Sequence, residues 1–129
     1  MSSTKPHILL VEDEADLIDI TQLAFESENI ELDVAVNGLE GIRLAKLKQP
    51  DLILMDVVMP VMTGFEAAKK IRKDRTTSKI PIFFLTAKSM EQDLQDGSDA
   101  GCERYFIKPV NPFEIAAIVR DYLSSKQAA

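Results

Sequence analysis

The 129-residue sequence predicts an α/β fold, a single doubly wound (βα)5 domain around a five-stranded, mainly parallel sheet. Two observations support this prediction. Short β-rich apolar runs recur along the chain, and longer stretches with helical spacing separate them. Some runs are continuously apolar, as in Ile8–Val11 and Ile82–Leu85, which is expected of parallel strands buried on both faces. The strands are expected at His7–Val11, Leu32–Val36, Leu52–Met55, Ile82–Thr86 and Arg104–Ile107.

The helices are expected from apolar stripes and from the residues that begin them. Stripes at helical spacing occur at Leu17, Ile20 and Ala24, at Phe65, Ala68 and Ile71, and at Ile115, Ile118, Val119 and Tyr122. Side chains able to satisfy free amide groups mark four helix starts: Asn37 with Glu40, Thr63 with Glu66, Ser89 with Gln92, and Asn111 with Glu114. The fourth helix, which begins near Ser89, has the fewest apolar anchors.

Composition places the chain among soluble globular proteins, with 46% hydrophobic and 28% charged residues. No apolar run approaches the roughly 20 residues that span a bilayer, and the start lacks a secretion signal. We therefore expect a cytoplasmic protein without membrane insertion. The formal charge of −6 argues against direct binding to nucleic acid, and the basic run from Lys69 to Arg75 is interpreted as a solvated helix face. The domain is expected over residues 5–125, with flexible tails at 1–4 and 126–129.

Polar residues follow four of the five expected strands. They are Glu12 and Asp13 after the first strand, Asp56 after the third, Thr86 at the end of the fourth and Lys108 after the fifth. Because the carboxyl ends of parallel strands share one edge of a sheet, these side chains should gather there. Each residue alone has an ordinary explanation, and Asp13 could be only a helix cap. Five of them at four strand ends favour a shared site.

Three converging carboxylates need a counter-charge. Two unit charges about 4 Å apart repel by roughly 4 kcal/mol at an effective dielectric constant near 20. Lys108 offsets part of this repulsion, and a divalent cation with oxygen ligands would offset the rest. Mg²⁺ suits one or two carboxylates with waters and a phosphate oxygen, with Mn²⁺ as an alternative. The absence of histidine and cysteine from these positions argues against zinc.

Four motifs surround these polar residues: Val11-Glu12-Asp13-Glu14, Met55-Asp56-Val57-Val58-Met59-Pro60, Leu85-Thr86-Ala87 and Tyr105-Phe106-Ile107-Lys108-Pro109. Together they resemble the receiver signature of two-component response regulators, the family of the chemotaxis receiver. The resemblance covers nearly the whole chain and implies a flavodoxin-like fold with strand order 2-1-3-4-5. The sequence departs from the family pattern at Glu12, where aspartate is more frequent, and at Val110, where phenylalanine often follows the Lys-Pro pair.

The resemblance also implies the chemistry of the site. Asp56 resembles the aspartate that takes a phosphoryl group from a phosphohistidine. Asp13, Asp56 and the backbone carbonyl of Val58 resemble the direct Mg²⁺ ligands, and Glu12 resembles the acid that acts through water. Lys108 resembles the lysine that pairs with the phosphoryl oxygens.

A signalling role follows from the same resemblance. Thr86 resembles the switch hydroxyl, Tyr105 the aromatic residue that follows its movement, and Pro109 a proline after a cis peptide bond. The face of the fourth helix, fifth strand and fifth helix would then control a downstream effector protein. The phosphoryl donor would be a sensor histidine kinase or a histidine phosphotransfer protein. The chain would be a monomer or a phosphorylation-dependent dimer. It would catalyse its own phosphorylation and dephosphorylation, but act as a switch rather than as an enzyme.

Two other classes of protein fit the sequence less well. A phosphatase of the haloacid-dehalogenase type needs a second carboxylate two residues after the nucleophile, where this sequence has Val58. A pseudo-receiver keeps the fold as an interaction scaffold but typically loses the acid pair, the aspartate or the lysine. All of these are present here.

Overall fold

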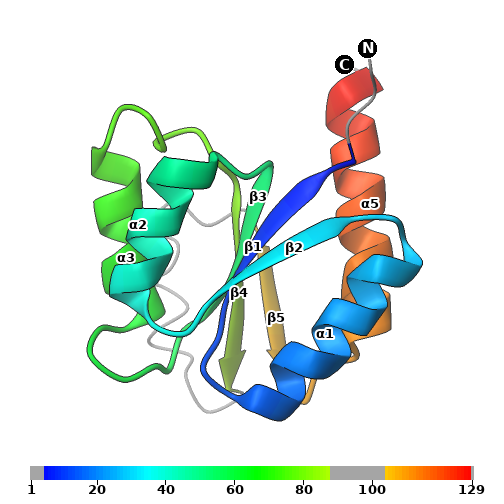
Figure 1. Ribbon diagram of the computed structural model, residues 1–129, viewed down its shortest axis with the longest axis horizontal. Coiled ribbons are helices and arrows are strands. Elements are labelled where there is room, and N and C mark those ends of the chain that lie inside the picture. The colour runs from blue at the N-terminus through cyan, green and yellow to red at the C-terminus, as the bar shows by residue number, and fades with distance from the viewer. Residues whose placement is uncertain (1–4, 88–103, 129) are drawn as a thin grey trace.

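The computed structural model describes residues 5–87 and 104–128, which form one parallel sheet between two layers of helices (Figure 1). The strands are β1 (His7–Val11), β2 (Glu31–Ala35), β3 (Leu52–Asp56), β4 (Ile82–Ala87) and β5 (Arg104–Lys108). The helices are α1 (Ala15–Ser27), α2 (Gly38–Lys48), α3 (Gly64–Lys73) and α5 (Pro112–Ala128). The strand order is β2-β1-β3-β4-β5, with every neighbouring pair parallel. Both the expected fold class and the expected order are confirmed.

β1 has the expected bounds, and each of the other four strands differs from the expected range by one residue at one or both ends. β2 begins at Glu31 because its backbone N–H donates to the carbonyl of Pro6 at 2.9 Å and so joins the sheet. It ends before Val36, whose N–H donates instead to the Glu40 carboxylate at 3.1 Å. Because the first residue of β2 is charged, the apolar run in the sequence does not mark where the strand begins.

The helix starts agree in part with the capping pairs expected from the sequence. Thr63 and Glu66 form a complete capping box at the start of α3. Asn37 accepts from the N–H of Glu40 at 2.9 Å, but the Glu40 carboxylate turns to Val36, so only half of that box forms. The Asn111 side chain accepts from the N–H of Phe113 at 3.0 Å, not from that of Glu114. The fourth helix and its Ser89 cap lie outside the described residues.

Alternating strand residues feed two separate cores. On β1, Leu9 and Val11 pack under α2 and α3, whereas Ile8 and Leu10 pack under α1 and α5. Figure 1 shows these two helix pairs on opposite sides of the sheet. All four β1 side chains are fully buried, and each contributes about 1.5–3 kcal/mol of apolar burial. The sheet is therefore held from both faces, and its carboxyl edge is left for the polar residues.

One expected core position is wrong. The apolar stripe of the first helix predicts that Ile20 is buried, but its side chain is 41% exposed. The buried face of α1 consists instead of Thr21, Ala24 and Phe25. The Thr21 hydroxyl donates to the carbonyl of Leu17 at 2.6 Å, which lets a polar residue take an inward position.

The last helix extends beyond the expected end of the domain. α5 continues to Ala128, three residues beyond position 125. The domain bounds stay a prediction. Among the described residues, no helix is both long and apolar enough to cross a membrane.

Candidate metal centre

Three carboxylates meet at the carboxyl edge of the sheet, between its two central strands. Glu12 and Asp13 follow β1, and Asp56 is the last residue of β3, the neighbour of β1. One oxygen from each side chain lies within 4.8 Å of the other two. Glu12 and Asp56 are buried, whereas Asp13 is exposed to solvent. The convergence expected from parallel-strand geometry is therefore confirmed for the acids.

Lys108 supplies the positive charge that these acids need. Its Nζ lies 3.2 Å from Oδ2 of Asp56 and 3.8 Å from Oε1 of Glu12. Burial by itself would lower the pKa of Lys108, but Asp56 and then Glu12 outweigh it and hold the pKa above its usual value. The lysine is therefore charged under all ordinary conditions. The Lys108–Pro109 peptide bond is cis, as the resemblance implied.

The surroundings of Glu12 disfavour the charged form of its side chain. Its Oε2 accepts from the N–H of Glu14 at 3.1 Å, while its buried Oε1 has no hydrogen-bond partner. Burial, and next the charge of Asp56, raise the pKa of Glu12 from its usual 4.5 to about 7. The single positive charge of Lys108 thus does not fully balance the charge of the three carboxylates.

The donor set fits a hard divalent cation. All three side chains offer carboxylate oxygens, and one of those oxygens is buried without a hydrogen-bond partner. Such a set matches Mg²⁺ better than metals that favour nitrogen or sulfur ligands. The N–H of Val58 donates to Oδ1 of Asp56 at 3.3 Å, which fixes the loop after β3 against the acid. The role of the Val58 carbonyl stays a prediction.

Gly64 positions the main chain of Asp56, although it is not among the site residues predicted from the sequence. A Cβ at position 64 would lie 2.3 Å from the carbonyl oxygen of Asp56, so only glycine fits there. The N–H of Gly64 also donates to the carbonyl of Val57 at 2.8 Å. The available signal was a glycine directly after the capping residue Thr63, where a close backbone approach is a common reason for glycine.

The loop between β3 and α3 contains one residue with an unfavourable backbone conformation. Val61 has a backbone φ of 75° and is 74% exposed, an unusual combination for a β-branched residue. The N–H of Met62 donates across it to the carbonyl of Pro60 at 2.8 Å. The loop therefore makes a tight three-residue turn beside the acid cluster.

Thr86 and Tyr105 lie on the strands beyond Asp56. Thr86 directly follows Leu85, the register partner of Asp56, and is buried with its hydroxyl donating to the carbonyl of Ala87 at 3.5 Å. Tyr105 is half-buried and stacks on Phe84, with ring centres 6.0 Å apart. Both residues sit where the sequence placed them, and their switching roles stay predictions.

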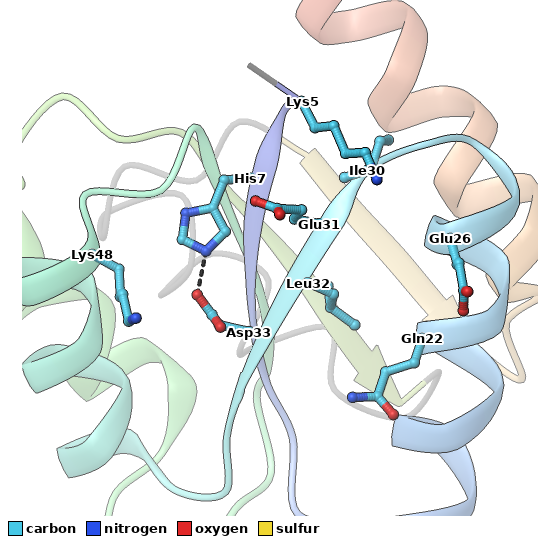
Figure 2. A pocket seen from close by; sticks show the side chains of 9 residues that line it. All are labelled: Lys5, His7, Gln22, Glu26, Ile30, Glu31, Leu32, Asp33 and Lys48. Atoms are coloured by element: carbon cyan, nitrogen blue, oxygen red, sulfur yellow. Dashed lines mark hydrogen bonds and ion pairs between the residues drawn. The ribbon is translucent and has the colours of Figure 1, made fainter.

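Two hollows flank the sheet, and their linings differ. One of about 360 Å³ borders the acid cluster and is mostly apolar, with Leu17, Ile20, Lys108 and Val110 among its lining residues. The larger, about 620 Å³, surrounds β2 near the opposite edge of the sheet. Figure 2 shows His7 paired with Asp33 there, with Lys48 on the same side of β2. Its lining mixes both charges without a converging set, so the acid cluster is the better functional candidate.

Comparisons with known proteins agree with this geometry. The chain is 36% identical over 117 residues to a probable transcriptional regulator, ycf29, of Porphyra purpurea, covering 91% of this chain and 56% of that protein. It is 42% identical over 118 residues to the transcriptional regulatory protein YvrH of Bacillus subtilis, covering 90% and 48%. The chain thus spans about half the length of the curated relatives it matches.

Solved structures show the same likeness. A CheY-like receiver domain protein from Methanospirillum hungatei superposes with a TM-score of 0.87 at 26% identity, covering 97% of this chain and 98% of that one. The receiver domain of a Pseudomonas aeruginosa sensor histidine kinase, with magnesium coordinated in its active-site cleft, gives 0.84 at 28% identity, covering 94% and 99%. The family described as response regulator receiver domain matches residues 8–120. The chain therefore belongs to the response regulator receiver domain family.

Proposed function

We propose that this receiver accepts a phosphoryl group on Asp56, in a Mg²⁺-dependent reaction with a phosphohistidine donor. The observation that carries the proposal is the contact of Asp56 with Lys108 at 3.2 Å, beside two further acids. A buried carboxylate next to a fixed cation suits a nucleophile whose product carries extra negative charge. The donor would be a sensor histidine kinase or a histidine phosphotransfer protein.

The transfer itself needs few groups. A carboxylate oxygen of Asp56 attacks phosphorus, an O–P bond forms, and the bond from phosphorus to the donor imidazole nitrogen breaks. Lys108, whose Nζ lies 3.2 Å from Oδ2 of Asp56, would stabilise the negative charge on the phosphoryl oxygens. Glu12, Asp13, Asp56 and the Val58 carbonyl would hold Mg²⁺, which when bound supplies further neutralisation of that charge.

The acyl phosphate would act as a signal rather than as the intermediate of an enzyme. New phosphoryl oxygens would offer further acceptors to the Thr86 hydroxyl, which lies on the strand next to Asp56 and donates to the carbonyl of Ala87 at 3.5 Å. Movement of Thr86 would let Tyr105 shift on Phe84 and alter the surface that β5 and α5 contribute to. A downstream effector protein would read that surface, with the receiver as a monomer or a phosphorylation-dependent dimer.

The relatives suggest where this signal would lead. Several of them are transcriptional regulators about twice as long as the matched region, so the effector function would lie outside the receiver itself. We propose a cytoplasmic receiver unit over residues 5–125. The comparisons name magnesium and give no support to the Mn²⁺ alternative.

Intact mass spectrometry after incubation with Mg²⁺ and a small-molecule phosphodonor tests the proposal. Wild type should gain one phosphoryl group, and Asp56→Asn should gain none. Asp121→Asn removes an exposed carboxylate elsewhere and should behave as wild type. No gain on the wild type would refute phosphoryl acceptance, whereas an undiminished gain on Asp56→Asn would refute only the site.

The metal assignment has a separate test. Asp13→Asn should retain the fold but need much more Mg²⁺ to reach the same phosphorylation rate, because it loses one carboxylate of the cluster. Mg²⁺ binding measured by calorimetry, without any phosphodonor, should weaken in parallel. Unchanged binding in this variant would rule out Asp13 as a ligand.

A further inference from the structure

The charges of this protein are separated along its chain. Between residues 38 and 80 the sequence has nine lysines and arginines against five acidic residues. Between residues 5 and 35 it has one lysine against nine acidic residues. The first region includes α2 and α3, and the second includes α1. These helices lie on opposite sides of the sheet (Figure 1), so the folded molecule has a positive side and a negative side.

The positive side presents a surface that we call the basic face. It consists of exposed residues of the packed helices α2 and α3: Arg43, Lys46, Leu47, Lys69, Lys70 and Lys73. Leu47 is 66% exposed among these cations. Within the described ranges, the one ion pair closer than 4 Å made by this set joins Lys46 to Asp74 at 3.5 Å. Most of its positive charge is therefore available to a partner.

The negative side presents an acidic face on α1. Its exposed residues are Asp16, Asp19, Ile20, Leu23 and Glu26, spaced so that they share one side of the helix. Ile20 and Leu23 are 41% and 61% exposed, so this face also mixes apolar side chains with charge of one sign. Both faces therefore combine exposed apolar side chains with charged ones, and the sign of the charge differs between the two faces.

Stabilisation of the helix dipoles does not explain this distribution. Basic residues in the last turns of α2 and α3 do favour those helices, but Arg43 and Lys69 lie before the last turn. On α1, Glu26 occupies the last turn, where a negative charge opposes the dipole, and no basic residue is there. Leu23 and Leu47 also add exposed apolar surface to the two faces, which a partner bound there would cover.

We propose that the acidic face of one copy of this chain binds the basic face of a second copy. Both halves of a complementary pair are present in one sequence, which favours a second copy over any other acidic or basic protein. Because the faces lie on opposite sides of the sheet, each bound copy leaves one face free, and the association is head to tail. Each face is small, and two chains of charge −6 repel at long range, so the contact is weak and transient.

Exchange of charges between the two faces tests this proposal without phosphorylation, so its outcome is independent of the proposed function. One variant, Arg43→Glu with Lys73→Glu, makes both faces acidic. The other, Asp19→Lys with Glu26→Lys, makes both faces basic. None of these four side chains takes part in an ion pair or side-chain hydrogen bond found among the described residues. Circular dichroism establishes that each variant folds.

Sedimentation velocity at near-physiological salt, from dilute to concentrated protein, provides the readout. The average mass of wild type should rise with concentration, and each variant alone should associate roughly tenfold more weakly, because two attractions become repulsions. An equal mixture of the two variants should regain wild-type association. Lys5→Glu with Lys126→Glu changes the net charge as much as the first variant but spares both faces, and should associate as wild type.

Three results would overturn the inference. Wild type could keep a constant mass at all concentrations. The mixture could associate no better than its separate components, which would place any self-association on other surfaces. The Lys5 and Lys126 control could lose association as fully as the first variant, which would make net charge the sole cause.

Discussion

The buried Glu12 carboxyl should make the metal-free protein less stable as pH rises, and Glu12→Gln should remove that dependence. Its pKa is about 7 in the folded protein against 4.5 normally, so the folded state binds this proton more tightly than the unfolded state. The protonated form is therefore fully favourable below about pH 4.5, and stability falls until about pH 7. From pH 5 to pH 8 these two pKa values give a loss of roughly 2 to 3 kcal/mol.

Urea unfolding in the presence of a chelator, followed at intervals between pH 5 and pH 8, measures this loss. Groups distant from the site titrate equally in wild type and Glu12→Gln, so the difference between their two profiles reports Glu12 together with the neighbouring charges it interacts with. Parallel profiles would refute the argument that burial and Asp56 disfavour the Glu12 charge. Added Mg²⁺ should flatten the wild-type profile, since a cation near the cluster favours the charged form.

Three further predictions concern the elements around the site, each measured by urea unfolding. Gly64→Ala should cost about 3 kcal/mol, because its Cβ would lie 2.3 Å from a backbone oxygen of Asp56. The control Gly38→Ala meets mainly a flexible methionine side chain at 3.1 Å and should cost far less; equal losses would contradict the steric argument. Val61→Gly should stabilise the protein by about 1 kcal/mol by relieving a backbone φ of 75°, and a loss of stability would show that the turn is unstrained. Thr63→Ala should cost about 1 kcal/mol through loss of the α3 cap while Thr63→Ser costs little, and equal effects of the two would exclude the hydroxyl as the cause.

Much of the fold could be predicted because its signals are local and repeated. β1 was located to the residue, since Ile8–Val11 is a continuous apolar run. The error at β2 arose because Glu31 takes its place in the sheet through its backbone alone. The error at Ile20 arose because a stripe on a short helix can be drawn along more than one face, and only packing against α5 and the sheet selects the buried one.

The candidate site was predicted in its membership but not in its energetics. Strand ends brought Glu12, Asp13, Asp56 and Lys108 together as parallel geometry requires. The sequence could not show that one Glu12 oxygen lacks a hydrogen-bond partner, because that depends on how the surrounding side chains pack around it. Nor could it show the contact of Gly64 with Asp56, which joins two residues through main-chain atoms.

The contact of Gly64 with Asp56 divides the site into a rigid half and an adjustable half. With no room for even one methyl group, the end of β3 and the start of α3 must move as a single body. Any response to a modified Asp56 is then directed along the sheet toward β5, where Lys108, which is 30% exposed, and the half-buried Tyr105 lie. A glycine whose side chain contributes no atoms to the reaction would thereby direct the signal from the site toward β5 rather than into α3.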